Sequence, residues 1–379
     1  MSKDTQDPKT PRELQPQDSS GELIRAHAEA QFAEELEALR AEDSKPRPEG
    51  WSLSPWAVVT YLMGGSLESG FKVSPKYFGA RRLMEVAVAT LVTDRALLLV
   101  GVPGTGKSWV SEHLAAAICG DSTLLIQGTA GMGEEAIRYG WNYAELLAKG
   151  PSERALVESP LMRAMRRGQL ARVEELTRIP SDVQDTLITV LSEKALPVAE
   201  LNMEVQARRG FNLIATANDR DRGVNELSSA LKRRFNTVVL PTPSSVEEEV
   251  TIVRERVASL GATLERVERR AADEDIRRVV TIFRELRQGL TLDGLTKLKQ
   301  TSSVLSAAEA ISVMNQCLAL SAHFGSGAVS AEDIASALKG AVVRDQSMDE
   351  PVWREYLDVV MKEREGWAEL YQACRAELS

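Results

Sequence analysis

Cysteine and histidine are both scarce in this chain of 379 residues, which contains three of each, scattered along the sequence. An odd number of distant cysteines supports neither a disulfide framework nor a CxxC metal site. The histidines likewise show no zinc-ligand spacing. The sequence therefore argues against a disulfide scaffold and against a histidine-based metal centre. The three cysteines are Cys119, Cys317 and Cys374.

Long hydrophobic runs and an excess of basic residues are also missing. The longest aliphatic run, Ala96–Val100, is far shorter than the ~20 residues needed to span a bilayer. The first twenty residues contain no apolar core, which argues against a secretory signal. Acidic residues outnumber basic ones 55 to 46, giving a net charge of −9. We therefore expect a cytoplasmic protein that binds no membrane and for which nucleic acid is an unlikely partner.

Changes in pattern along the chain predict four segments. Residues 1–50 form an acidic arm with seven Lys/Arg and twelve Asp/Glu, disordered over residues 1–20 and helical over residues 21–41. This arm is either a solvated tether or a helix that docks a partner. Residues 51–241 alternate strands and helices, residues 242–345 show helical spacing only, and residues 346–379 form a C-terminal helical extension.

The alternating region predicts an α/β fold, because strands that alternate with helical segments pair in parallel beneath a cover of helices. Two longer stretches, at about residues 127–168 and 193–210, are expected to be inserts in this pattern. Five aliphatic segments are the candidate strands. They are Ala96–Val100, Thr123–Ile126, Gln169–Val173, Asn212–Thr216 and Asn236–Leu240.

The strongest motif, GVPGTGKS, lies between the first of these strands and a good helix-forming segment. It fits the phosphate-binding P-loop (Walker A) pattern at every fixed position. Its glycines let backbone N–H groups point at phosphate oxygens, Lys107 supplies a charge for the β- and γ-phosphates, and Ser108 offers a hydroxyl to Mg²⁺. The expected cofactor-binding residues are Gly101, Val102, Pro103, Gly104, Thr105, Gly106, Lys107, Ser108 and Trp109.

A P-loop also needs acidic residues at the end of a neighbouring strand, and Glu174 and Glu175 follow the strand at residues 169–173. One carboxylate would serve the metal and the other would orient the attacking water. Arg172 is unusual within such a strand. The alternative interpretation is a pair of glutamates on a solvated helix.

Two further polar positions complete the candidate site. Asn218, just beyond an apolar strand, is placed to sense the γ-phosphate or the attacking water, although it could instead form a turn. Arg233 and Arg234 end a short helical segment. They are either an arginine finger that acts on a neighbour's nucleotide or basic residues that simply favour the helix dipole.

Taken in order, GVPGTGKS, VEELTRIPSDVQDTLITVLSE, LIATANDRD and SSALKRRFN resemble the motifs of the AAA+ ATPases, and more narrowly those of the MoxR branch. Arg178 and Pro180 match the second acidic motif of that branch, whereas Glu174 and Thr177 depart from it. Ser306–Glu309 lacks the arginine that the helical lid of such proteins usually carries.

The resemblance implies an αβα core with a five-stranded parallel sheet, followed by an all-helical lid, assembled as a hexameric ring with ATP between subunits. It implies that Ser108 and Glu174 hold Mg²⁺ and that Lys107 binds phosphate. Glu175 would be the catalytic base, Asn218 the sensor, and Arg234, or Arg233 beside it, the trans finger.

The expected activity is therefore ATP hydrolysis coupled to the remodelling of a protein client. The resemblance also implies a separate partner with a von Willebrand factor A domain. Two alternatives remain: a nucleic-acid motor or loader, and a nucleotide-gated scaffold that turns ATP over slowly.

Overall fold

A computed structural model of the chain describes residues 25–218, 225–261 and 271–378. Its centre is a five-stranded sheet with the strand order β11-β3-β10-β7-β4, in which all neighbours are parallel. Each predicted strand is present within two residues of its expected bounds, so the predicted α/β fold class is correct. The strands are β3 (Ala96–Gly101), β4 (Leu125–Gln127), β7 (Leu170–Glu174), β10 (Asn212–Asn218) and β11 (Phe235–Val239).

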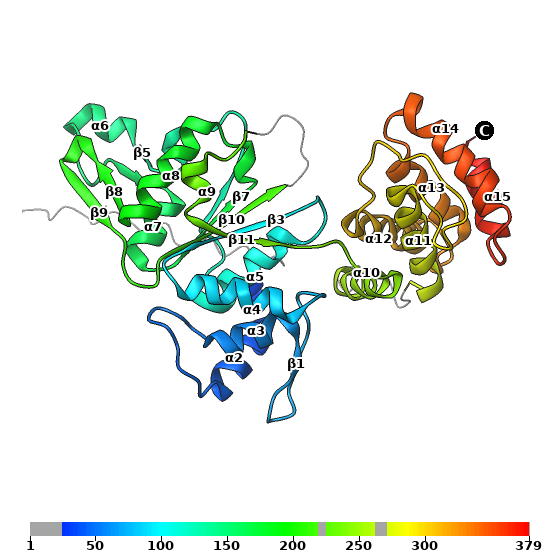
Figure 1. Cartoon of the computed structure of the whole chain (residues 1–379), viewed down its shortest axis with the longest axis horizontal. Helices are drawn as coiled ribbons and strands as arrows, with labels where there is room; N and C mark the ends of the chain where they lie inside the picture. Colours follow the sequence, from blue (N-terminus) through cyan, green and yellow to red (C-terminus); the bar gives the residue numbers. More distant parts are fainter. Residues whose placement is uncertain (1–24, 219–224, 262–270, 379) are drawn as a thin grey trace, which may run out of the picture.

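Helices cover both faces of this sheet and make three layers (Figure 1). Leu97 and Leu99 of β3 face one helical layer, whereas Ala96 and Leu98 face the other, as the alternation of side chains along a strand requires. The first layer contains α3 (Pro55–Met63), α4 (Arg81–Val92) and α5 (Lys107–Cys119). The second contains α7 (Pro160–Arg167), α8 (Ser181–Glu193) and α9 (Ser229–Lys232).

Both predicted inserts contain an antiparallel strand pair. In the first, α6 (Tyr143–Lys149) lies between β5 (Tyr139–Trp141) and β6 (Leu156–Glu158). The second is the hairpin of β8 (Ala195–Val198) and β9 (Met203–Gln206). The remaining short elements are β1 (Gly65–Ser66), β2 (Lys72–Val73), η1 (Glu134–Ala136), η2 (Leu176–Arg178) and η3 (Ala199–Leu201).

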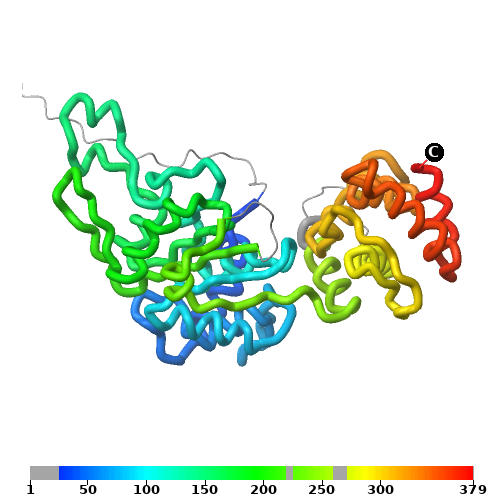
Figure 2. Tube along the Cα trace, turned by 45° about the horizontal axis from the view of Figure 1, so that its top comes forward, coloured from blue at the N-terminus to red at the C-terminus, as the bar shows by residue number. Residues whose placement is uncertain are grey.

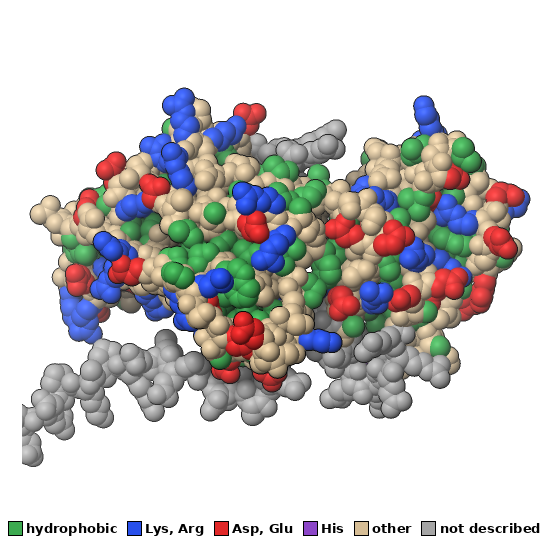
Figure 3. Space-filling model, turned by 60° about the horizontal axis from the view of Figure 1, so that its bottom comes forward, with side chains coloured by type: hydrophobic (Ala, Val, Ile, Leu, Met, Phe, Trp, Pro, Cys, Tyr) green, Lys and Arg blue, Asp and Glu red, His purple; other side chains and the backbone are tan. Residues whose placement is uncertain are grey.

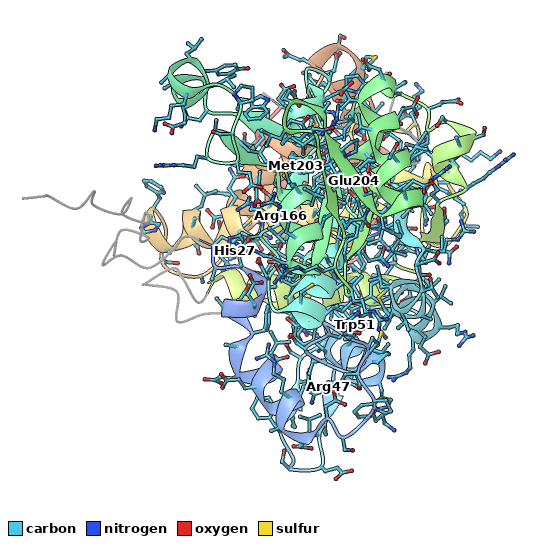
Figure 4. The ribbon with its side chains drawn as sticks, turned by 90° about the vertical axis from the view of Figure 1, so that its left-hand side faces the viewer. His27, Arg47, Trp51, Arg166, Met203 and Glu204 are labelled. Carbon is cyan, nitrogen blue, oxygen red and sulfur yellow. The ribbon has the colours of Figure 1, made fainter. Side chains whose placement is uncertain are left out.

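The N-terminal arm is helical but is no solvated tether over its described residues. α1 (Ala28–Gln31) and α2 (Ala33–Glu42) follow the outside of the core from His27 to Arg47 (Figure 4). Leu36 and Leu39 are buried in the same hydrophobic cluster as α3 and α5. The apolar face of this helical segment therefore packs on the chain's own core. The predicted disorder of residues 1–20 lies outside the described residues.

The segment after β11 leads from the core to a helical lid (Figure 2). The lid contains α10 (Val246–Gly261), α11 (Asp273–Gln288), α12 (Ala307–His323), α13 (Ala331–Val342), α14 (Gln346–Tyr356), a π-helical turn (Leu357–Met361) and α15 (Ala368–Ala376). Trp353 and Tyr356 are buried in the same cluster as Phe283 of α11, so the C-terminal extension is part of the lid core. None of the helices within the described ranges is long and apolar enough to cross a membrane.

Candidate nucleotide-binding site

The loop after β3 has the backbone geometry of a phosphate cradle. Gly104 and Gly106 have φ angles of 82° and 79°, which residues with a Cβ atom adopt only at a cost. Gly106 is also the N-cap of α5, so the loop ends at a helix N-terminus, whose free N–H groups and dipole attract anions. The Thr105 hydroxyl donates to the Val102 carbonyl at 3.0 Å and closes the loop.

Lys107 is the first residue of α5 and is buried. Its ammonium donates to the carbonyls of Gly101 and Val102 at 3.0 and 2.9 Å. These contacts hold the charge inside the loop, where it can neutralise a phosphate oxygen.

Glu174, the last residue of β7, is buried and accepts hydrogen bonds from four side chains. Oε2 accepts from the hydroxyls of Ser108 and Thr216 at 2.7 and 2.6 Å. Oε1 accepts from Arg172 at 3.0 Å and from the Ser111 hydroxyl. A buried carboxylate is tolerated only when it is paired and fully hydrogen-bonded, and these four donors meet that requirement.

Arg172 explains why a basic residue stands within the strand. It pairs with Glu174 and also donates to the carbonyls of Ser122 and Ser108 at 3.0 and 3.2 Å. Its charge therefore balances the buried carboxylate, and its other donors fix the first turn of α5 against β7.

Glu175 differs from Glu174 in backbone and environment. Its φ of 53° is left-handed, and its N–H donates to the Thr216 hydroxyl at 3.0 Å. The carboxylate accepts from Arg178 at 3.0 Å. Thr216 thus links the two glutamates, since it donates to Glu174 and accepts from Glu175. The turn after β7 thereby separates one buried acid from one that lines a cavity.

A cavity of about 420 Å³ joins the phosphate loop to Glu175. Its volume lies within the usual range for small-molecule sites. At one end it is bounded by Glu175, Thr216 and Asn218, at the carboxyl ends of β7 and β10. At the other end it is bounded by the loop before α4, the segment after β11 and the lid. Its lining includes Lys76, Tyr77, Phe78, the loop from Pro103 to Trp109, Pro241, Pro243, Ile252, Arg256, Ala307 and Ile311.

Arg233 and Arg234 are the predicted site residues that lie away from this cavity. They precede β11, and the Ala96 N–H at the start of β3 donates to the Arg234 carbonyl. The P-loop follows the opposite end of β3. The six residues of that strand separate the two positions by about 20 Å at 3.3 Å per residue. Both arginines are therefore remote from the nucleotide site of their own chain. Arg234 contacts the Ser192 hydroxyl, and the Arg233 carbonyl accepts from Arg95.

Several residues at the site escaped prediction from the sequence. Ser111 and Thr216 carried no signal beyond being polar in a helix and in an apolar strand. Arg256 of α10 lies 147 positions after Trp109, yet its guanidinium carbon is 3.5 Å from the centre of the Trp109 ring. Contacts between such distant positions have no local pattern in a sequence.

The parallel αβα fold, the phosphate loop entering α5 and the acidic end of β7 define an ATP hydrolase of the AAA+ class. Comparison with known families agrees. Residues 96–235 match the family described as "AAA domain (dynein-related subfamily)". Residues 247–377 match the "YehL-like AAA+ ATPase C-terminal domain". The chain belongs to the YehL-like AAA+ ATPases.

The relatives include the "Uncharacterized protein YehL" of Escherichia coli (strain K12), 39% identical over 364 residues, covering 93% of this chain and 97% of that protein. Midasin of Dictyostelium discoideum is 33% identical over 109 residues, covering 27% of this chain and 2% of midasin. Among solved structures, NtrX from Brucella abortus in complex with ADP aligns with a TM-score of 0.49 at 14% identity, covering 79% of this chain and 66% of that one.

Proposed function

We propose that this ATPase acts as a homo-oligomeric ring of the MoxR type, a hexamer, that remodels or activates a protein client with a von Willebrand factor A domain partner in trans. The observation that supports a ring is the position of Arg233 and Arg234. They lie at the amino end of β11, whereas the cavity of their own chain lies at the carboxyl ends of the strands. A finger placed there can serve only a neighbouring subunit. We place this work in the cytoplasm, since all three cysteines are free.

The surface supports assembly. Val86 and Val92 of α4 and Val239 of the edge strand β11 are exposed, and α4 packs beside β11. Figure 3 shows hydrophobic side chains gathered on the core in the face it draws, whereas acidic and basic side chains are interspersed over the lid. Exposed apolar groups of this kind are typical of protein contacts.

The metal that accompanies ATP fits the donors present. Ser108 and Glu174 would hold it. The Ser108 hydroxyl oxygen is the type of ligand that Mg²⁺ prefers, and Glu174, whose oxygens already accept four hydrogen bonds, adds its negative charge beside it. Because the Ser108 hydroxyl donates a hydrogen bond to Glu174, its lone pairs are available to a cation. Mg²⁺ supplies charge neutralisation for the phosphate oxygens when it is bound with ATP.

Hydrolysis is then in-line attack by water on the γ-phosphorus. The oxygen of water bonds to phosphorus, the bond from phosphorus to the β–γ bridging oxygen breaks, and Glu175 accepts the water proton. Asn218 orients the water, Lys107 neutralises the phosphate charge, and Arg234 of the adjacent subunit, with Arg233 beside it, stabilises the transition state.

A mixing experiment tests the ring. Protein with Arg234→Ala and protein with Glu175→Gln should each hydrolyse ATP at least 10²-fold more slowly than wild type. Mixed subunits should regain activity, because an Arg234→Ala subunit keeps Glu175 and receives the arginine of its neighbour. A mixture of Lys107→Ala and Glu175→Gln should stay inactive. Failure of the first mixture to recover would contradict the trans finger.

The client proposal has a separate test. A Glu175→Gln ring loaded with ATP should retain its client and partner through affinity purification, and mass spectrometry would identify them. Lys107→Ala, which cannot hold ATP, is the matched control. Proteins retained equally by both variants would count against nucleotide-dependent remodelling.

One observation favours a second candidate, the slowly hydrolysing nucleotide-gated scaffold. The carboxylate of Glu175 is engaged by Arg178, and a base held in an ion pair is a poorer acceptor for a proton. Phosphate release by the assembled wild type, compared with Glu175→Gln, separates the two functions. Equal rates would favour the scaffold.

A further inference from the structure

The cavity extends beyond Glu175 and Asn218 to a second end, which has no part in the proposed hydrolysis. Trp109 follows Ser108 directly, and its indole N–H donates to the Lys76 carbonyl at 2.8 Å. The ring also packs against His113, with centroids 4.1 Å apart. Trp109 is thereby fixed on the core side of the cavity, against the loop before α4.

The lid reaches this end of the cavity through α10. Arg256 lies over the face of the Trp109 ring, with 3.5 Å between the guanidinium carbon and the ring centre. Both residues line the cavity, together with Ile252 one turn earlier on α10. A guanidinium over an indole face is a favourable cation–π contact.

Arg256 is half-buried, and no hydrogen bond or ion pair to its guanidinium occurs among the described residues. Burial lowers the pKa of Arg256, and the nearby charge of Arg25 lowers it further, while Glu112 opposes this. Arg25 and Glu112 are themselves paired. An anionic ligand in the cavity would therefore stabilise the charged form of Arg256.

Position within the sheet decides which part of a nucleotide Arg256 would meet. Glu175 and Asn218 follow β7 and β10, on one side of β3, so the γ-phosphate lies there. Pro241 follows β11, on the other side of β3. Tyr77, Phe78 and Pro241 make that side of the cavity largely apolar, as a purine requires. Arg256 is at this nucleoside end.

We propose that Arg256 is a nucleotide-binding residue that contacts the sugar and α-phosphate of the bound nucleotide from the lid, with the Trp109 ring as its platform. The contact joins α10 of the lid to the first turn of α5. The proposal rests on the nucleotide site described above.

The test is the affinity of the full-length protein for MgADP and MgATP, measured by isothermal titration calorimetry. Arg256→Ala should weaken both by a similar factor of about 10, because the sugar and α-phosphate are common to the two ligands. Arg256→Lys should fall between this variant and wild type, because it keeps the charge and loses the planar stack. Arg254→Ala is the matched control, since Arg254 is on the same helix and pairs with Asp273 at 3.1 Å.

A thermal shift separates ligand binding from a structural role. Arg256→Ala should melt near the wild-type temperature without nucleotide and should lose part of the stabilisation by MgADP. Trp109→Ala combined with Arg256→Ala should bind no more weakly than the worse single variant. Wild-type affinity in Arg256→Ala would overturn the proposal and leave the ATPase assignment intact. Loss of binding in Lys107→Ala checks the site itself.

Discussion

The two ends of the cavity differ in the side-chain contacts that form them. At the hydrolytic end, Glu174 is fixed by four donors from β7, β10 and α5, all within the core. At the nucleoside end, aromatic and aliphatic side chains from the core and the lid surround Arg256. The guanidinium of Arg256 lies over the face of the Trp109 ring.

This difference separates two tasks. Transition-state stabilisation needs groups that are already in place, and a hydrogen-bonded cage inside one rigid sheet provides them. Holding the lid against the core needs a contact that can form and break at low cost, and the cation–π contact of Arg256 with Trp109 provides one. Substitutions at the hydrolytic end should therefore affect rate and core stability, whereas substitutions at the nucleoside end should affect affinity.

The largest effect is expected at the base. Glu175→Gln should lower the rate of ATP hydrolysis by about 10²–10⁴-fold, because the amide cannot accept the proton of water. Binding of MgATP should stay within twofold of wild type. Steady-state phosphate release and calorimetry measure the two quantities. A parallel loss of binding would show that the hydrolytic end also carries affinity, which would break the comparison.

The next effect concerns the stability of the cage. Arg172→Met should lower the free energy of unfolding by about 3–5 kcal/mol, because Glu174 is then left charged and buried without its cation. Urea unfolding followed by circular dichroism measures this. Arg166→Met on α7 is the control, because its partly exposed pair with Glu158, at 2.7 Å, should contribute only about 0–1 kcal/mol. Equal losses in the two variants would contradict a cage role for Arg172.

The aromatic support behind the nucleoside end should be sensitive to acid. His113 shares a hydrogen bond with the Tyr61 hydroxyl at 2.8 Å and packs against Phe32 of the arm. Burial lowers the pKa of His113 from 6.5 to about 2, and the charges of Lys76, Arg256, Arg172 and Arg25 add to this.

The folded protein therefore keeps His113 neutral where the unfolded chain binds a proton, so stability falls as pH decreases below 6.5. The loss is about 1.4 kcal/mol per pH unit. His113→Gln should remove this part of the pH dependence between pH 6.5 and 5 in urea unfolding. An unchanged slope would assign the acid sensitivity to other groups.

The smallest effect is expected at Arg178. Its pair with Glu175 is partly exposed and worth about 0.4 kcal/mol. Arg178→Ala should therefore raise the basal rate of hydrolysis by about twofold and leave the affinity for MgADP unchanged. Arg138→Ala, which breaks a comparable exposed pair with Glu134, is the control. A large loss of activity would instead give Arg178 a direct part in catalysis.

Much of the core was predictable because its signals are local. The strand at 96–101 is a run of aliphatic residues that leads directly into the phosphate loop and the first turn of α5, so the pattern lies within a few residues of the chain. Docking of the arm was not predictable. Leu36 and Leu39 are buried in the core cluster, and no local pattern in the arm identifies the elements that cover them.

The cage was predictable only in part. The two adjacent glutamates were visible in the sequence, but their opposite environments depend on the left-handed turn at Glu175. Arg172 stood out as unusual, and its partner Ser111 became known only from the way α5 packs on β7.

The left-handed backbone of Glu175 creates a trade-off between thermal stability and catalysis at one position. A residue with a Cβ atom gives up about 1–2 kcal/mol in this conformation, which glycine adopts freely. A screen that rewards only resistance to heat should therefore select Glu175→Gly and recover a sturdier protein that no longer hydrolyses ATP. A glutamate at this position would then reflect selection for ATP turnover at the expense of thermal stability.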